Sequence, residues 1–324
     1  MSYLLQNLII ALNDGSSYAL IAIGYTMVYG VLRLINFAHG DVFMIGAFIG
    51  AYTARFINPP VPGVVSPEQT IWHAFLGIVV AMAVCGTLGY LIERVAYRPL
   101  RRSPKLSALI IAIGISLLIE SLAQFKWNFG GLSFFGPDPL RYPPIAGSGR
   151  SIEFLHRTLG ISVVGKDLIV LGTTFITLIG VYLIVQHTKT GKAMRAVSQN
   201  YDAARLMGVD IDRIISFTFV LGSMLAAIGG CLWGLNRNQC TSLMGLIPGL
   251  KAFVAAVIGG IGNIPSAAVG GITIGLLETM VSTVQYHNTA ILSPYRDGIA
   301  FLILIIVLLV KPEGIFGKAV PEKV

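Results

Sequence analysis

The sequence contains several apolar stretches that are long enough to cross a lipid bilayer as helices. A spanning helix needs about 20 mostly apolar residues, because backbone groups in hydrocarbon must be hydrogen-bonded within their own segment. Five stretches meet this requirement most clearly, namely 71–92, 106–125, 167–186, 214–235 and 299–310 with its flanks. Four more are apolar but broken by Gly, Pro or polar residues, namely 3–32, 40–56, 246–262 and 266–284. The pattern predicts about eight spans, or nine.

Composition agrees with lipid as the main solvent of this chain. Hydrophobic residues make up 55%, charged residues only 12%, and the mean hydropathy is +0.77, which excludes a water-soluble domain. We expect an all-α polytopic membrane protein with one transmembrane domain over residues 1–324. Segments 246–262 and 266–284 either each cross the membrane or together form a re-entrant pair. The polar residues Asn13 and Asp14, followed by Gly15, leave the first stretch as one span or as a surface helix followed by a span.

Clusters of Lys and Arg set the expected orientation, because positive residues in short loops stay on the cytoplasmic side. One cluster comprises Arg94, Arg98, Arg101, Arg102 and Lys105, and another comprises Lys189, Lys192, Arg195, Arg205 and Arg213. Both loops and the tail from Lys311 are predicted to be cytoplasmic, and the long loop 126–166 periplasmic. Helix parity would place the N-terminus outside. Since the basic residues flank spans, the net charge of +8 fits a multi-pass inner-membrane protein rather than nucleic-acid binding.

The sequence offers no recognisable site for ATP hydrolysis or other catalysis. The nearest approach to a phosphate-binding loop is HTKTGKAM, where the required Gly and Ser or Thr positions are held by Gln186 and Ala193. GGIGNIP at 259–265 lacks a strand-to-helix unit around it and fits tight helix packing instead. No triad, carboxylate pair or metal-ligand cluster has a usable spacing. We therefore expect a protein that is not an enzyme and holds no cofactor.

Polar residues at breaks in apolar segments are candidates for a translocation pathway, because polarity in lipid is costly and usually faces a cavity or a partner. These residues are Asn36, His39 and Asp41 at one break and Asn263 at another. A histidine beside a glycine at a helix start is also typical of a packed or capping residue, so this alternative stays open for His39. Glu120 and Glu278 lie near span ends, where a solvated position competes with a place in the pathway.

Four segments of the chain carry a family resemblance. They are SSYALIAIGYTMVYGVLRLINFAHGDVFMIGAFIGAY (16–52), TGKAMRAVSQNYDAARLMGVDIDRIISFTFVLGSMLAAIGG (190–230), KAFVAAVIGGIGNIPSAAVGGITIGLLE (251–278) and YRDGIAFLILIIVLLVKPEGIFG (295–317). Together they closely resemble LivH-type permeases of bacterial ABC importers for branched-chain amino acids, and the INFAHGD core is the most specific part. The resemblance covers nearly the whole chain.

This resemblance implies a type II-like importer permease that translocates branched-chain amino acids. Its implied partners are a second, M-type permease, two cytoplasmic ATPases and a periplasmic binding protein. Urea and short-amide permeases form a close branch whose core reads INMAHGE, and Phe37 and Asp41 favour amino acids instead. The other alternative is a stand-alone ion-coupled secondary transporter. It would need acidic residues near mid-membrane, for which this chain offers only Glu120 and Glu278.

The resemblance also implies which segments carry function. The run DAARLMG (202–208) fits the EAA-x-x-x-G pattern of importer permeases, which predicts that segment 188–213 docks on the ATPase. Its small residues would press against the ATPase, and its glycine would let the chain turn back toward the bilayer. The predicted coupling residues are Gly191, Arg195, Asp202, Ala203, Ala204 and Gly208. The predicted pathway residues, at the interface with the M-type partner, are Asn36, His39 and Asn263.

Overall fold

The computed structural model of the protein describes residues 2–59, 68–101, 104–129, 132–149, 161–283, 285–286, 289–290, 293–311 and 314. Its α-helices are α1 (Ser2–Leu32), α2 (His39–Ile57), α3 (Ile71–Ile92), α4 (Lys105–Gln124), α6 (Gly165–His187), α7 (Lys189–Gln199), α8 (Tyr201–Leu206), α9 (Ile211–Arg237), α10 (Leu246–Gly259), α11 (Ile264–Thr283) and α12 (Arg296–Val310). A π-helix (Glu93–Tyr97) extends α3, and a 3-10 helix (Ser293–Tyr295) precedes α12.

Three short antiparallel strand pairs connect the helices. β1 (Trp127–Phe129) pairs with β2 (Leu132–Phe134), β3 (Leu140–Arg141) with β4 (Gln239–Cys240), and β5 (Gln285–Tyr286) with β6 (Thr289–Ala290). Part of the predicted periplasmic loop, residues 130–131 and 150–160, lies outside the described residues. So does most of the predicted cytoplasmic tail, residues 312–313 and 315–324.

Every apolar stretch that the sequence marks as a candidate span forms a helix. Within the described ranges, seven helices are long and apolar enough to cross a membrane: α1, α2, α3 with its π-helical extension, α4, α6, α9 and α11. The helices α10 and α12 are also apolar but shorter, with 14 and 15 residues. The expectation of an all-α polytopic membrane protein is confirmed.

α1 is one continuous helix, so the alternative of a surface helix followed by a span is wrong. Asp14 and Gly15 are tolerated inside this helix because α9 donates hydrogen bonds to the first and α11 packs on the second. The Asp14 carboxylate accepts hydrogen bonds from Arg237 (3.0 Å) and Asn236 (3.3 Å) of α9. A Cβ on Gly15 would lie 2.9 Å from the Cα of Ile272, so glycine here lets α11 pack backbone against backbone.

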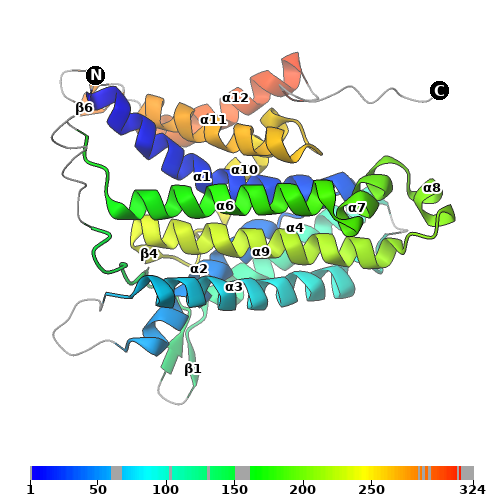
Figure 1. The fold of residues 1–324 in the computed structure, drawn as a ribbon, viewed down its shortest axis with the longest axis horizontal. Coiled ribbons are helices and arrows are strands. Elements are labelled where there is room, and N and C mark those ends of the chain that lie inside the picture. Colours follow the sequence, from blue (N-terminus) through cyan, green and yellow to red (C-terminus); the bar gives the residue numbers. More distant parts are fainter. Residues whose placement is uncertain are drawn as a thin grey trace.

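The helices form two halves that pack in corresponding ways around α1 and α9, which contact each other. In one half, α1 contacts α10 and α11, and α12 packs on α10. In the other half, α9 contacts α2 and α3, and α4 packs on α2. Figure 1 shows α6, which lies between α4 and α9 in the sequence, running alongside α9. Paired halves of this kind are typical of transporters, in which broken helices lie at the interface between repeats.

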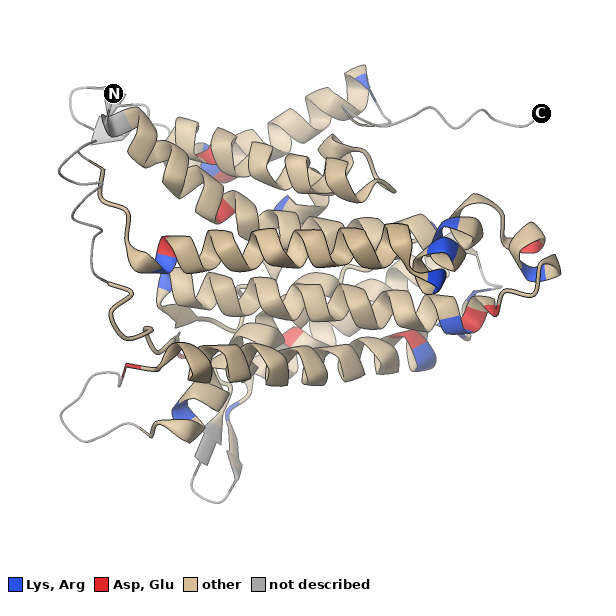
Figure 2. Ribbon diagram, viewed as in Figure 1, with Lys and Arg blue, Asp and Glu red and all other residues tan. Residues whose placement is uncertain are grey.

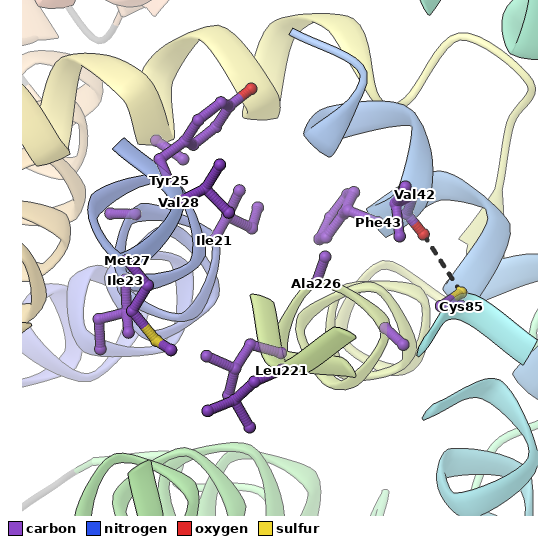
Figure 3. Packing of buried hydrophobic residues seen from close by; sticks show 14 of the residues in the cluster. Ile21, Ile23, Tyr25, Met27, Val28, Val42, Phe43, Cys85, Leu221 and Ala226 are labelled. Carbon is purple, nitrogen blue, oxygen red and sulfur yellow. Dashed lines mark hydrogen bonds between the residues drawn. The ribbon is translucent and has the colours of Figure 1, made fainter. Parts of the chain in front are cut away.

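The core lies between α1, α2, α3 and α9 (Figure 3). Ile21 of α1, Phe43 of α2 and Ala226 of α9 are completely buried there. The thiol of Cys85 in α3 lies 3.5 Å from the carbonyl oxygen of Val42 in α2. Close packing of this kind fixes the positions of the long helices, and with them the places where α2 and α10 begin.

The two ends of the bundle differ. At one end α7 and α8 project beyond the long helices, and we call this the α8 end (Figure 1). Strands β1 to β4 lie at the other end, the β4 end. Many of the Lys and Arg residues lie at the α8 end, where the ribbon is blue in Figure 2. Gly262 and Arg195 line the same cavity, so the turn after α10 lies at the α8 end as well.

Candidate functional site

Two broken helices meet inside the bundle. α2 follows the non-helical segment 33–38, and α10 follows segment 241–245. The first turns of the two helices touch, because a Cβ on Gly40 would lie 2.4 Å from the carbonyl oxygen of Gly245 and 3.1 Å from the Cα of Gly249. The N-cap residues, Ala38 of α2 and Gly245 of α10, have no polar side chain, so neither helix start is capped by a side-chain hydrogen bond. Two positive helix-dipole ends therefore point toward one region, which suits an anionic group.

Gly40→Ala is expected to destabilise the protein by about 1–3 kcal/mol, because the added methyl group overpacks a backbone contact that cannot relax. Thermal unfolding of the purified protein in detergent measures this loss. Gly114→Ala is the matched control, since a Cβ on Gly114 of α4 meets nothing within 4 Å. Equal unfolding temperatures for the two variants would contradict the expectation.

The structure places Asn36 and His39 on the buried side of the first break. The Oδ1 atom of Asn36 accepts a hydrogen bond from the hydroxyl of Tyr97 at 3.1 Å. The His39 imidazole is held against α1, where a Cβ on Gly24 would lie 2.2 Å from its Nε2 atom. The ring of Tyr25 packs edge-on against it at a centroid distance of 4.8 Å. His39 therefore packs α2 onto α1, and Gly24 provides the space for its ring.

The other two polar residues at the predicted breaks, Asn263 and Asp41, have different hydrogen-bond partners from this pair. Asn263 is exposed in the turn between α10 and α11, and its carbonyl oxygen accepts the first hydrogen bond of α11, from the N–H of Ala267 at 3.0 Å. Asp41 is buried in the first turn of α2 and accepts a hydrogen bond from Ser116 of α4. Of the three predicted pathway residues, the structure joins Asn36 and His39 by a backbone hydrogen bond. It places Asn263 in the turn after α10, near the α8 end.

The break region has an exposed apolar face and a cavity beside it. Leu243, Leu246 and Ile247, at the start of α10, are exposed on the surface of the chain. A cavity of about 360 Å³ opens between the end of α1, segment 33–38 and α4. It is lined by Tyr29, Arg33, Leu34, Ile35, Leu106 and Leu109. Its walls are mainly aliphatic, with one guanidinium group and one phenol hydroxyl.

A buried ion cluster that the sequence reading missed joins α10 to α11 and α12. The Lys251 ammonium lies 2.6 Å from a carboxylate oxygen of Glu278 and 2.6 Å from one of Asp297. The hydroxyl of Tyr18 donates a 3.1 Å hydrogen bond to the other Glu278 oxygen. Side chains of Lys251 and Glu278 are only 2% and 5% exposed. The solvated position that the sequence left open for Glu278 is therefore wrong, because its carboxylate is buried and neutralises a cation.

The signal for this cluster was a single lysine inside an apolar run. Charged residues within spans are rare and almost always paired, so Lys251 alone predicts an acidic partner in another helix. Its partners could not be chosen from the sequence, because Glu278 and Asp297 lie in different helices from the lysine.

In the predicted coupling segment, Gly191 and Arg195 contact their own chain. A Cβ on Gly191 would lie 2.3 Å from the carbonyl oxygens of Ile184 and Val185, so glycine lets α7 fold back against the end of α6. The guanidinium of Arg195 donates hydrogen bonds to both the side chain and the carbonyl oxygen of Gln186 in α6. These two residues orient α7 relative to α6.

The rest of the predicted coupling residues lie on or next to α8. Asp202 and Ala203 are exposed, but Ala204 is 4% exposed and packs against its own chain. Gly208 has a φ of +79°, a conformation that favours glycine, and it ends α8 so that the chain can turn into α9. The sequence reading missed Leu206 and Met207, which are 88% and 84% exposed. They form the apolar tip of the α8 end.

Comparison with known proteins identifies the family. Residues 7–308 match the family described as branched-chain amino acid transport system / permease component. The chain is 35% identical over 322 residues to the high-affinity branched-chain amino acid transport system permease protein LivH of Salmonella typhimurium, covering 99% of this chain and 98% of that protein. The LivH protein of Escherichia coli K12 has the same identity and coverage. BraD of Pseudomonas aeruginosa, described as the permease protein of such a system, is 36% identical over 320 residues, covering 99% and 98%. The chain therefore belongs to the branched-chain amino acid transport system permease family.

Proposed function

We propose that this chain is a membrane-spanning permease subunit of an ATP-driven importer for branched-chain amino acids in the inner membrane. The observation that carries the proposal is the similarity to LivH and BraD over nearly the full length of all three chains. We further propose that it pairs with a second, M-type permease, that two ATPases bind on the cytoplasmic side, and that a periplasmic binding protein delivers the substrate.

The α8 end is proposed to face the cytoplasm. The basic residues of both predicted cytoplasmic loops that the structure describes lie there, in agreement with the positive-inside tendency (Figure 2). The chain near residue 314 lies at the same end, because a Cβ on Gly314 would lie 2.7 Å from the Cα of Gly260, where α10 has ended. The start of α1 lies toward the β4 end, since Asp14 contacts the end of α9. We therefore propose a cytoplasmic C-terminus and a periplasmic N-terminus.

We propose that α8 is the helix that docks on an ATPase. It is short, projects from the bundle, and carries the exposed apolar pair Leu206 and Met207 beside the exposed Ala203. Apolar side chains that are almost fully exposed to water usually mark an interaction site. Gly191 and Arg195 would act by orienting this segment, and Gly208 by shaping the turn that follows it.

We propose that the translocation pathway passes the two helix breaks, on the face that meets the second permease. The exposed leucine and isoleucine side chains at the start of α10 suit the aliphatic side chain of the substrate. The two uncapped helix N-termini suit its carboxylate. Asn36 and His39 would lie just behind this face and fix the geometry of the first break, and Asn263 would lie at its cytoplasmic end.

Reconstitution in liposomes tests the function. The chain, its permease partner and the ATPases are expected to take up radiolabelled leucine only when the binding protein is outside and hydrolysable ATP is inside. A non-hydrolysable ATP analogue is the control. Leucine uptake by this chain alone, driven by an ion gradient, would show a secondary transporter instead. Uptake of urea in place of leucine by the complete assembly would move the chain to the urea-type branch.

A further inference from the structure

The first turn of α9 is bound to the segment that joins α3 to α4. Asp212 of α9 accepts hydrogen bonds from both Arg98 and Arg101. Arg101 also donates to Glu93, and the same carboxylate accepts a 2.5 Å hydrogen bond from Ser216 of α9. Glu93 is fully buried at the end of α3. Because Asp212 and Ser216 are one helical turn apart, they present one face of α9 to segment 93–101.

This face of α9 is connected directly to α8. The N–H of Val209 donates to the carbonyl oxygen of Ala204 in α8 at 3.1 Å. The next residue, Asp210, caps α9 by accepting a 3.1 Å hydrogen bond from the N–H of Arg213. The turn between the two helices is therefore short and hydrogen-bonded at both sides, so we expect a displacement of α8 to move the first turn of α9.

The same segment reaches the first helix break at its inner end. Residues 93–97 form a π-helix, a rare conformation that is frequent at functional sites. Its last residue, Tyr97, packs on Phe219 of α9 at a ring-centroid distance of 5.1 Å. The Tyr97 hydroxyl donates to Asn36, and the carbonyl oxygen of Asn36 accepts the N–H of His39, where α2 begins. Contacts therefore run without interruption from α8 to the break before α2.

We propose that segment 93–101 transmits the movement of α8 to the break before α2, and that the hydrogen bond from Tyr97 to Asn36 is its last link. Tyr97 is thus a positioning residue, which acts on the pathway through Asn36. This inference rests on the proposed roles of α8 and of the breaks. The break is suited to move, because segment 33–38 has no helical hydrogen-bond ladder of its own, whereas α9 is one continuous helix of 27 residues. When an ATPase shifts α8, the network would pull the start of α2 with it.

Tyr97→Phe tests the last link, since it removes one hydroxyl and keeps the ring against Phe219. In the complete importer in liposomes we expect ATP hydrolysis within about twofold of wild type. The number of leucine molecules taken up per ATP should fall about fivefold or more, the lower bound for a coupling between sites. Tyr90→Phe on the exposed face of α3 is the matched control and should leave this ratio unchanged.

A double-mutant cycle separates transmission from folding. Asn36→Ala is expected to lower the same ratio, and the variant carrying both changes should be no worse than the worse single variant, because both remove one link. Three results would each overturn the inference. The first is a wild-type number of leucine molecules per ATP for Tyr97→Phe, and the second is a loss in the double variant equal to the product of the single losses. The third is an equal loss of ATP hydrolysis and leucine uptake. If the wild-type assembly itself takes up no leucine with ATP, the proposed function fails rather than this inference.

Discussion

Lys251→Met is expected to destabilise the protein by about 3–5 kcal/mol, the range measured when one partner of a buried ion pair is removed. Methionine fills a similar volume but leaves the carboxylates of Glu278 and Asp297 without their shared cation. The Glu278 side chain is almost completely buried, so its charge cannot be hydrated. Thermal unfolding of the purified protein in detergent, together with its yield in the membrane fraction, measures the effect.

The variant Lys251→Met with Glu278→Gln is the control, because it removes both charges that are deeply buried. We expect it to recover more than half of the lost stability, since Asp297 is half-exposed and can reach polar surroundings. Tyr18→Phe removes only the hydrogen bond to Glu278 and should cost about 1 kcal/mol. If Lys251→Met unfolded at the wild-type temperature, the ion pair between Lys251 and Glu278 would contribute nothing to stability.

Leu206→Asp and Met207→Asp are each expected to abolish leucine uptake while leaving the permease correctly inserted. Both side chains lie in solvent in the free chain, so a charge there costs its folding little. In a docked complex, the charge would lie in an apolar contact, where loss of a central side chain costs about 2 kcal/mol or more. Recovery of the ATPases with the tagged permease should therefore fall about 30-fold, and co-purification measures this.

Arg205→Ala is the matched control on the same helix. It removes an exposed charge whose pairing would contribute about 0.5 kcal/mol, so ATPase recovery should fall about twofold at most. Ala203→Trp tests the small exposed position and should also reduce recovery. Substitutions of Ala204 or Gly208 are less informative about docking, because the first is buried in its own chain and the second has a positive φ. Undiminished recovery with both aspartate variants would remove α8 as the docking helix.

The position of the break before α2 could be predicted from the sequence, but the break before α10 and the orientation of the residues at the first break could not. Asn36 and His39 interrupt an apolar run, and polarity at such a point has to be compensated wherever the chain goes. The sequence could not show that a phenol hydroxyl binds Asn36, or that a glycine of α1 leaves room for the His39 ring. Those groups lie in other helices and meet the break only after the bundle has packed.

The coupling segment shows the same division. The run 202–208 predicted a turn of the chain at its glycine, and the structure has a positive φ at Gly208, directly after the helix Tyr201–Leu206. The direction of each side chain depended on the packing of α8 against α9. That packing buries Ala204 and exposes Leu206 and Met207, which the motif had not distinguished.

By itself, the sequence determined which stretches enter the membrane, where the first of the two breaks lies and which end carries positive charge. These properties depend on local composition, because hydrocarbon selects apolar helices one segment at a time. Only the tertiary structure decided how polar groups inside the membrane are compensated. Asp14 remains in a continuous helix because Arg237 reaches it, and Lys251 is tolerated in α10 because Glu278 comes from α11. Such pairs join helices that are distant in sequence, so they exist only once the whole bundle has closed around them.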